Sequence, residues 1–210
     1  DWYPNTRMVA IENTVNKGGG SVYTVEEMKA ISDFCRSRKL IIHLDGARIF
    51  NALEFLGKTP AHLAGIFDSV SVCISKGLGA PAGSVLAGTK EMIKKARKIR
   101  KVMGGGMRQS GLLAAACVYA LDNNISRLAE DHRKARMLAQ TLESCAWVKQ
   151  VLPAETNIVI FEVEDAAKTA TQLAEKGIRT SPFSPTLVRM VTHLDVTEEM
   201  LEFTLQKLKE

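Results

Sequence analysis

The sequence predicts an α/β protein with a mostly parallel sheet and flanking helices, followed by a small α+β domain at its C-terminal end. Apolar runs of strand length alternate with helix-like amphipathic stretches over most of the 210 residues. Two of these runs end abruptly in polar and charged residues, one at Asp45 and the other at Lys76. A break over 148–153 precedes a second set of strand and helix patterns. We therefore expect one domain at 1–150 and a second at 151–210.

The expected elements of the first domain follow from local patterns. Residues 7–13 resemble a short strand that ends in polar residues, and Thr24 opens a capping box for a helix to about Ser37. Further along the chain we expect a strand over 40–45, a helical connection over 60–65, the strand leading to Lys76, a return strand over 84–88, and helices over 90–102, 109–121 and 124–146.

The second domain has a βαββα pattern. A strand is expected over 157–163, a helix over 165–175 with Gly177 just past its end, and another strand over 187–192. A final helix starts near Thr197, where acidic residues in the first turn suit the helix dipole.

Composition narrows the functional classes. An apolar share of 46% is ordinary for a soluble protein, and no apolar run approaches the length of about 18 residues that spans a bilayer. The four cysteines and four histidines lack metal-ligand spacing, so we expect no metal site and reduced thiols in a cytoplasmic protein. The net charge of +5 and the basic run over 94–101 fit the solvated face of a helix. Nucleic-acid binding is the rival interpretation of this run, but it lacks interleaved aromatic residues.

Lys76 and Asp45 together indicate a site where an amine reacts with a carbonyl group. A lysine at a strand end in tight apolar surroundings has its charged form disfavoured, which frees the amine to attack a carbonyl. In a parallel sheet, ligands bind beyond the carboxyl ends of the strands. An aspartate and a lysine at the ends of two such strands suit the binding of pyridoxal 5'-phosphate. In that arrangement the aspartate pairs with the protonated pyridine nitrogen and the lysine forms a Schiff base with the aldehyde. The alternatives are a lysine that extends into water and an acid that caps a helix turn.

Four motifs carry a family resemblance. The segments His43-Leu-Asp-Gly-Ala-Arg, Ser75-Lys-Gly-Leu-Gly-Ala-Pro, Gly104-Gly-Gly-Met-Arg-Gln and Val191-Thr-His-Leu-Asp closely resemble the low-specificity L-threonine aldolases. These are pyridoxal-phosphate lyases of fold type I, so the resemblance implies that residues 1–150 belong to a fold type I large domain. The chain begins at Asp1 inside a motif-bearing region, and the resemblance implies that the N-terminal third of the family's chain is absent.

The resemblance also implies roles for individual residues. Lys76 would be the Schiff-base lysine, Asp45 would pair with the pyridine nitrogen, and Arg48 would reach the phenolic oxygen of the cofactor. His43 would lie beside the ring. Lys101 and Arg108 would bind the phosphate of the cofactor, in the same or in a neighbouring subunit. Arg189 and Asn13 would bind the amino-acid substrate.

One position departs from the family pattern. Many relatives carry histidine where this chain has Val15, in the motif that begins at Glu12. If that histidine removes the proton from the substrate hydroxyl, this protein uses another base or a water molecule.

The resulting expectation is a pyridoxal-phosphate-dependent aldolase that cleaves L-threonine and L-allo-threonine to glycine and acetaldehyde, as a homodimer or homotetramer. Within the same cofactor class, a beta-eliminating lyase or an amino-acid racemase stays open. So does an inactive proteolytic fragment of such an enzyme. Outside that class, the alternative is a basic binding protein that uses residues 94–101.

Overall fold

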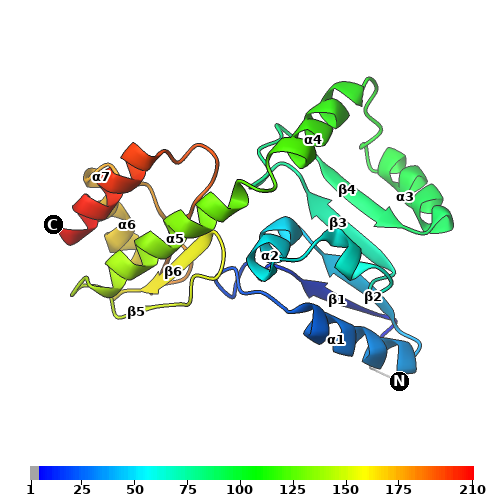
Figure 1. Ribbon diagram of the computed structural model, residues 1–210, viewed down its shortest axis with the longest axis horizontal. Coiled ribbons are helices and arrows are strands. Elements are labelled where there is room, and N and C mark those ends of the chain that lie inside the picture. Colours follow the sequence, from blue (N-terminus) through cyan, green and yellow to red (C-terminus); the bar gives the residue numbers. More distant parts are fainter. Residues whose placement is uncertain (1–4) are drawn as a thin grey trace. The chain divides into compact units, whose positions relative to one another are not determined.

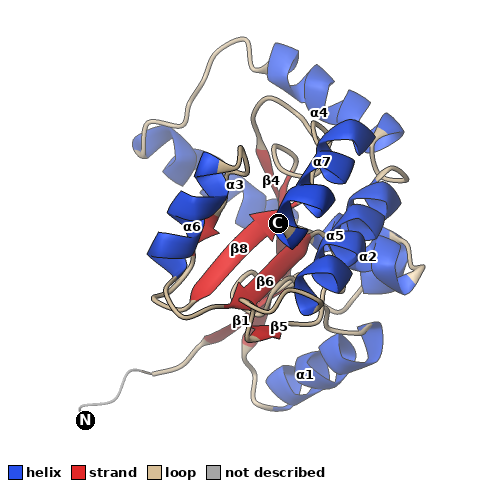
Figure 2. Ribbon diagram, turned by 90° about the vertical axis from the view of Figure 1, so that its left-hand side faces the viewer, coloured by secondary structure: helices blue, strands red, loops and turns tan. Residues whose placement is uncertain are grey.

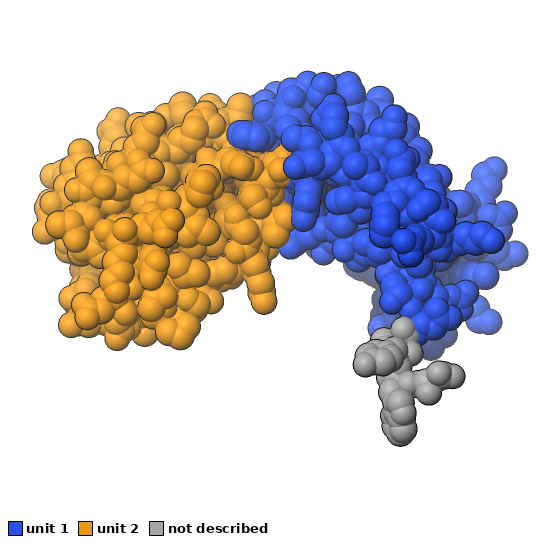
Figure 3. Space-filling view, turned by 90° about the horizontal axis from the view of Figure 1, so that it is seen from below, with its two compact units in different colours: residues 1–14, 23–126 blue, residues 15–22, 127–210 orange. Residues whose placement is uncertain are grey.

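The protein divides into two compact units, which Figure 3 colours separately. The computed structural model describes residues 5–210. The first unit comprises residues 1–14 and 23–126, and the second comprises 15–22 and 127–210. The predicted domain boundary after residue 150 stays a prediction, and residues 127–150 lie in the second unit of this division. The physical reason is helix α5 (Leu128–Glu143), which packs against strand β6 and helix α7 of the second unit.

A four-stranded sheet forms the centre of the first unit (Figure 1). Strands β1 (Met8–Glu12), β2 (Ile41–Asp45) and β3 (Ser69–Cys73) are parallel neighbours in that order. Strand β4 (Ser84–Gly88) pairs antiparallel with β3. The prediction of a mostly parallel sheet is confirmed. In the register of this sheet Asp45 lies between Glu12 and Ser71, so the carboxyl ends of the three parallel strands form one edge.

The helices of the first unit follow their capping signals. Helix α1 (Val25–Ser37) begins with the predicted capping box, in which Thr24 and Glu27 each bond the backbone N–H of the other. Helix α2 (Ile49–Leu56) was not predicted, because its eight residues follow the polar end of β2 without a capping side chain. The others are the 3-10 helix η1 (Pro60–Leu63), α3 (Lys90–Val102) and α4 (Gly111–Asn123).

The second unit is built on an antiparallel sheet (Figure 2). Its strands run in the order β5 (Gln150–Val151), β6 (Ile158–Glu162), β8 (Leu187–Val191) and β7 (Ser181–Pro182). Helix α6 (Ala166–Glu175) packs on β7 and β8, and helix α7 (Glu198–Lys209) packs on α5. The central strands and both helices match the prediction. The two-residue edge strands β5 and β7 are too short to give an alternating pattern.

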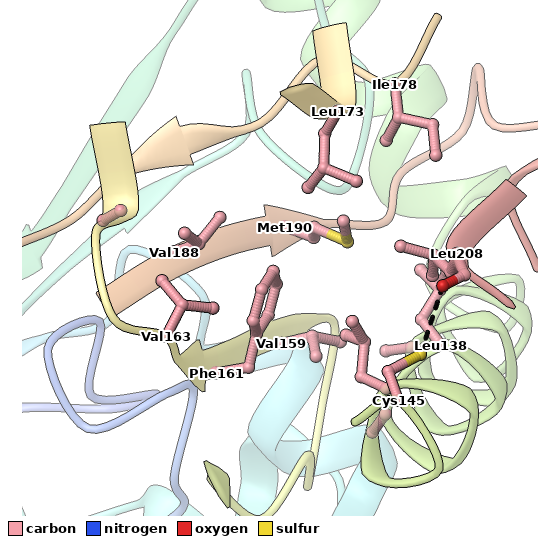
Figure 4. Close-up of a cluster of buried hydrophobic side chains, with 14 of the residues drawn as sticks. Leu138, Cys145, Val159, Phe161, Val163, Leu173, Ile178, Val188, Met190 and Leu208 are labelled. Carbon is pink, nitrogen blue, oxygen red and sulfur yellow. Dashed lines mark hydrogen bonds between the residues drawn. The ribbon is translucent and has the colours of Figure 1, made fainter. Parts of the chain in front are cut away.

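The core of the second unit lies between this sheet and its helices (Figure 4). Phe161 on β6 is fully buried and meets Trp147 edge-on, with 5.9 Å between ring centroids. The Cys145 thiol, also buried, donates a hydrogen bond of 3.3 Å to the carbonyl oxygen of Leu208, which ties α7 to the end of α5. All four cysteines are free thiols.

Two further observations concern the surface. The basic residues over 94–101 are all exposed, as expected for the solvated face of α3, and Ala96 between them is half-buried. Among the helices of residues 5–210, none combines the length and the apolar character that crossing a bilayer requires.

Candidate active site

Asp45 lies at the carboxyl edge of the first sheet, where backbone hydrogen bonds hold the ends of three strands together. The backbone N–H of Asn13 donates to the carbonyl oxygen of Asp45 at 3.0 Å, and that of Gly46 donates to Ser71 O at 2.8 Å. A Cβ on Gly46 would lie only 2.8 Å from Ser71 O, so glycine permits this close approach. The carboxylate of Asp45 is exposed and accepts a hydrogen bond from the N–H of Ala47 at 3.1 Å through Oδ1. Its position is therefore fixed by the backbone on both sides.

Lys76 lies on the turn that follows β3, at the same edge of the sheet. Buried Ile74 and Leu78 anchor this turn on either side of the lysine. The N–H of Ile74 donates to Gly83 O at 3.0 Å, and the side-chain amide of Asn124 donates to Leu78 O at 2.7 Å. Lys76 itself is exposed. The expectation of tight apolar surroundings is wrong for this chain, because β3 ends at Cys73 and the lysine lies beyond the packed part of the strand.

His43 shares a face of β2 with Asp45. Alternation along the strand buries Ile42 and Leu44 on the opposite face and leaves His43 half-buried. Its Nδ1 lies 2.7 Å from the hydroxyl oxygen of Ser69 on the neighbouring strand. This contact orients the imidazole ring, a constraint that the sequence did not reveal. The half-buried Arg48 immediately precedes α2, three residues after Asp45.

The two basic residues predicted to bind phosphate both lie on the surface. Lys101 is in the last turn of α3 and Arg108 follows the glycines at 104–106; the whole segment is exposed. Asn13, predicted to bind substrate, is fully buried. Its side-chain amide donates to Tyr23 O at 3.0 Å and accepts from Tyr23 N at 3.3 Å. These contacts occupy the polar groups of Asn13 with protein atoms and give no support to its predicted role.

Arg189 belongs to the second unit, where it lies on β8. Its Nη1 donates to Oδ1 of Asn16 at 3.0 Å, and its guanidinium carbon lies 5.3 Å from the centre of the Phe183 ring. The Nε atom is buried and has no partner within residues 5–210. In the same part of the chain, no carboxylate lies within ion-pair distance of this guanidinium. Within residues 5–210 no ion pair therefore occupies Arg189, and N–H groups of its guanidinium are left for an external acceptor.

Comparison with known proteins identifies the family to which these residues belong. The profile of the family described as beta-eliminating lyase matches residues 1–166, which is most of the chain. The chain belongs to the beta-eliminating lyase family.

Two similar proteins are named as L-threonine aldolases. The chain is 39% identical over 210 residues to low-specificity L-threonine aldolase 1 of Arabidopsis thaliana, a match that covers 97% of this chain and 59% of that protein. It is 43% identical over 201 residues to the low specificity L-threonine aldolase of Escherichia coli O157:H7, covering 95% of this chain and 58% of the relative. The chain therefore spans less than two thirds of the length of these relatives.

Solved structures give the same fold. The threonine aldolase of Leishmania major superposes with a TM-score of 0.80 at 25% identity, covering 97% of this chain and 60% of that one. The histidinol-phosphate aminotransferase of Clostridium acetobutylicum, at 20% identity and a TM-score of 0.71, shares the fold alone. The predicted α/β architecture of fold type I is confirmed by these neighbours.

The residues present in this beta-eliminating lyase family member fit a pyridoxal cofactor. Asp45 has a second carboxylate oxygen, Oδ2, with no donor within residues 5–210, and Lys76 offers an exposed amine beyond the adjacent strand. An acid for a ring nitrogen and an amine for an aldehyde are the two groups this cofactor requires of its protein.

Sequence reasoning missed three side chains that contact predicted site residues within their own units. Ser69 contacts His43, and its only signal was its place at the start of a strand. Asn16 accepts a hydrogen bond from Arg189, and the sequence gives no signal for this partner. Phe183, which stacks on Arg189, lies in a turn and gave no signal.

Proposed function

We propose that the full-length protein is a pyridoxal-phosphate-dependent aldolase that cleaves L-threonine and L-allo-threonine to glycine and acetaldehyde. The observation that carries the proposal is the edge shared by Asp45, which ends β2, and Lys76, which follows β3. These adjacent parallel strands are tied by the hydrogen bond from Gly46 N to Ser71 O. The relatives named as L-threonine aldolases support the choice of reaction.

Each residue has a defined task in this proposal. Lys76 would hold the aldehyde carbon of the cofactor through its amine, and Asp45 would accept a hydrogen bond from the ring nitrogen and keep it protonated. When bound, the cofactor supplies an electron sink for the pair released as the bond between Cα and Cβ breaks. Arg189 would bind the substrate carboxylate through its planar guanidinium, which matches a carboxylate with two parallel hydrogen bonds.

The remaining residues would orient the cofactor or the substrate. Arg48 would bind the phenolic oxygen, and His43, held by Ser69, would lie beside the ring. Lys101 and Arg108 would bind the phosphate group of the cofactor that is held by a second copy of the chain. The base that removes the β-hydroxyl proton is unassigned, since Val15 is an aliphatic residue that cannot do so.

A homodimer or homotetramer in the cytoplasm is part of the same proposal. Helix α4 exposes large apolar side chains, with relative exposure of 82% at Leu112 and 65% at Tyr119. An apolar helix in water is stabilised when another surface covers it. A full-length Leu112→Asp variant should therefore shift toward monomer in light scattering, and an unchanged mass would contradict the use of α4 in assembly.

Spectroscopy of the full-length protein tests the cofactor assignment. Reconstitution with pyridoxal 5'-phosphate should produce an absorbance band near the edge of the visible range, and Lys76→Ala should abolish it. The matched control is Lys58→Ala. Lys58 is an exposed lysine after α2, and its substitution should leave the band unchanged. A band that survives Lys76→Ala would refute the proposal.

A beta-eliminating lyase is the second candidate, because the family description carries that name. Product analysis separates the two activities. An aldolase releases glycine and an aldehyde from threonine, whereas an eliminating lyase releases ammonia and a keto acid.

A further inference from the structure

The buried polar residues at the start of β6 have no part in the reaction described above. Thr156 and Asn157 are both buried, with relative exposures of 0% and 2%. Burying a hydroxyl and an amide costs free energy unless each finds a hydrogen-bond partner. The partners of this Thr156–Asn157 pair lie on two segments that are far apart in the sequence.

Asn157 holds the end of β8, the strand that carries Arg189. Its side-chain amide donates to the carbonyl oxygen of Thr192 at 3.0 Å, and its own carbonyl accepts from Thr192 N at 3.0 Å. Thr192 also donates its hydroxyl proton to the carbonyl oxygen of Asp131 at 2.7 Å. Both backbone polar groups of Thr192 are thus fixed by one residue, three positions after Arg189.

Thr156 holds the loop that carries Asn16. Its hydroxyl donates to Gly20 O at 2.8 Å. Gly20 has a positive φ of +81°, and a Cβ at this position would lie 2.6 Å from Oγ1 of Thr156, so the contact is close. The loop closes on itself through the N–H of Gly20, which donates to Val15 O at 2.9 Å. Thr156 therefore fixes the loop next to Asn16.

The contacts of Thr156 and Asn157 support one hydrogen bond, which Arg189 donates to Asn16. These two residues are 173 positions apart in the sequence. Two adjacent residues hold the two sides of this bond: Thr156 holds the loop of the acceptor and Asn157 holds the strand of the donor. A hydrogen bond that a guanidinium donates to a fixed acceptor restrains the orientation of the group, and that orientation decides whether a carboxylate meets two N–H groups or one.

We propose that Thr156 and Asn157 are positioning residues for Arg189, which set the orientation of its guanidinium toward the carboxylate of the amino-acid substrate. This inference rests on the carboxylate-binding role proposed for Arg189. Neither residue touches the substrate; both act through Asn16, Thr192 and the backbone.

A comparison of two ligands tests the inference in the full-length holoenzyme. Glycine carries a carboxylate and glycinamide does not, and the dissociation constant of each is measurable from the change in cofactor absorbance. Thr156→Val and Asn157→Ala should each raise the dissociation constant of glycine about tenfold, the loss expected for one misaligned hydrogen bond to a charged group. The dissociation constant of glycinamide should stay within about twofold of the original value.

Three further variants make each outcome decisive. Thr156→Ser keeps the hydroxyl and should restore glycine binding, while Thr171→Val removes a comparable hydroxyl contact within α6 and should change neither ligand. Equal weakening of glycine binding and glycinamide binding by the Thr156 and Asn157 variants would overturn the inference, because a general structural role affects both.

Arg189→Gln is the reference variant. If it fails to weaken glycine selectively, the role proposed for Arg189 falls; if it succeeds while the other two variants have no effect, only the positioning inference falls.

Discussion

His132 should make the second unit less stable as the pH falls from 7 to 5. The residue lies on α5 and is buried, with 3% relative exposure. Burial, and secondarily the positive charge of Arg136, lower the pKa of His132 to about 4. In the unfolded chain the imidazole takes up its proton near its ordinary pKa of about 6.5. Between these two values the unfolded state binds more protons, so the free energy of unfolding decreases as the pH falls.

The size of the effect follows from the two pKa values. Linkage with a folded-state pKa of about 4 and an unfolded-state pKa of about 6.5 gives a loss of about 2 kcal/mol between pH 7 and pH 5. The effective dielectric inside a protein exceeds that of a dry interior and reduces this figure, so we expect a loss of about 1 to 2 kcal/mol. The loss is complete only when the pH falls through about 4, where the folded protein also protonates His132.

Amide hydrogen exchange of α5 and β6 in the full-length protein measures this loss within the second unit itself. The matched variant is His132→Gln, which stays neutral at every pH and keeps a polar side chain. Burial also raises the pKa of the neighbouring Asp131, an effect of opposite sign on stability, but Asp131 is present in both proteins and cancels in the comparison. The protection of the parent protein should fall relative to that of the variant between pH 7 and pH 5. Parallel curves for the two proteins would refute the reasoning.

Three other changes test the structure at separate places. Phe161→Ala should destabilise the second unit by about 3 to 5 kcal/mol, because it removes a fully buried ring from the core, and hydrogen exchange of β6 and α5 would report it. Thr24→Ala should cost α1 about 1 kcal/mol by removing its capping contacts, measured as faster exchange in its first turns while α6 stays unchanged. Gly46→Ala should weaken binding of pyridoxal 5'-phosphate about tenfold or more, since the new methyl group collides with Ser71 O and displaces Asp45; unchanged affinity would contradict the tie between the two strands.

Local patterns in the sequence determined much of the fold. The capping box at Thr24 marks the start of α1, and the N-cap side chains of Asp165 and Thr197 mark the starts of α6 and α7. Strands β1, β2, β6 and β8 lie where the apolar runs predict them. Each of these features depends on residues within a few positions of one another, so periodicity and capping chemistry were sufficient.

The main candidates of the active site were also visible in the sequence. Asp45 and Lys76 each follow an apolar run, and the parallel pairing of β2 with β3 brings the ends of those runs to one edge. The prediction concerned residue types at strand ends, and the topology of a parallel sheet supplied the rest. The exposure of Lys76 was not predictable in this way, because it depends on where β3 leaves the packed part of the sheet.

Only the tertiary structure decided the features that join distant segments. The bond between Arg189 and Asn16, its support by Thr156 and Asn157, and the inclusion of α5 in the second unit all depend on residues that lie far apart along the chain. The sequence by itself therefore determined which side chains are available for chemistry and which segments form helices and strands. Their partners were decided by the fold, because hydrogen-bond partners across such separations leave no local pattern in the sequence.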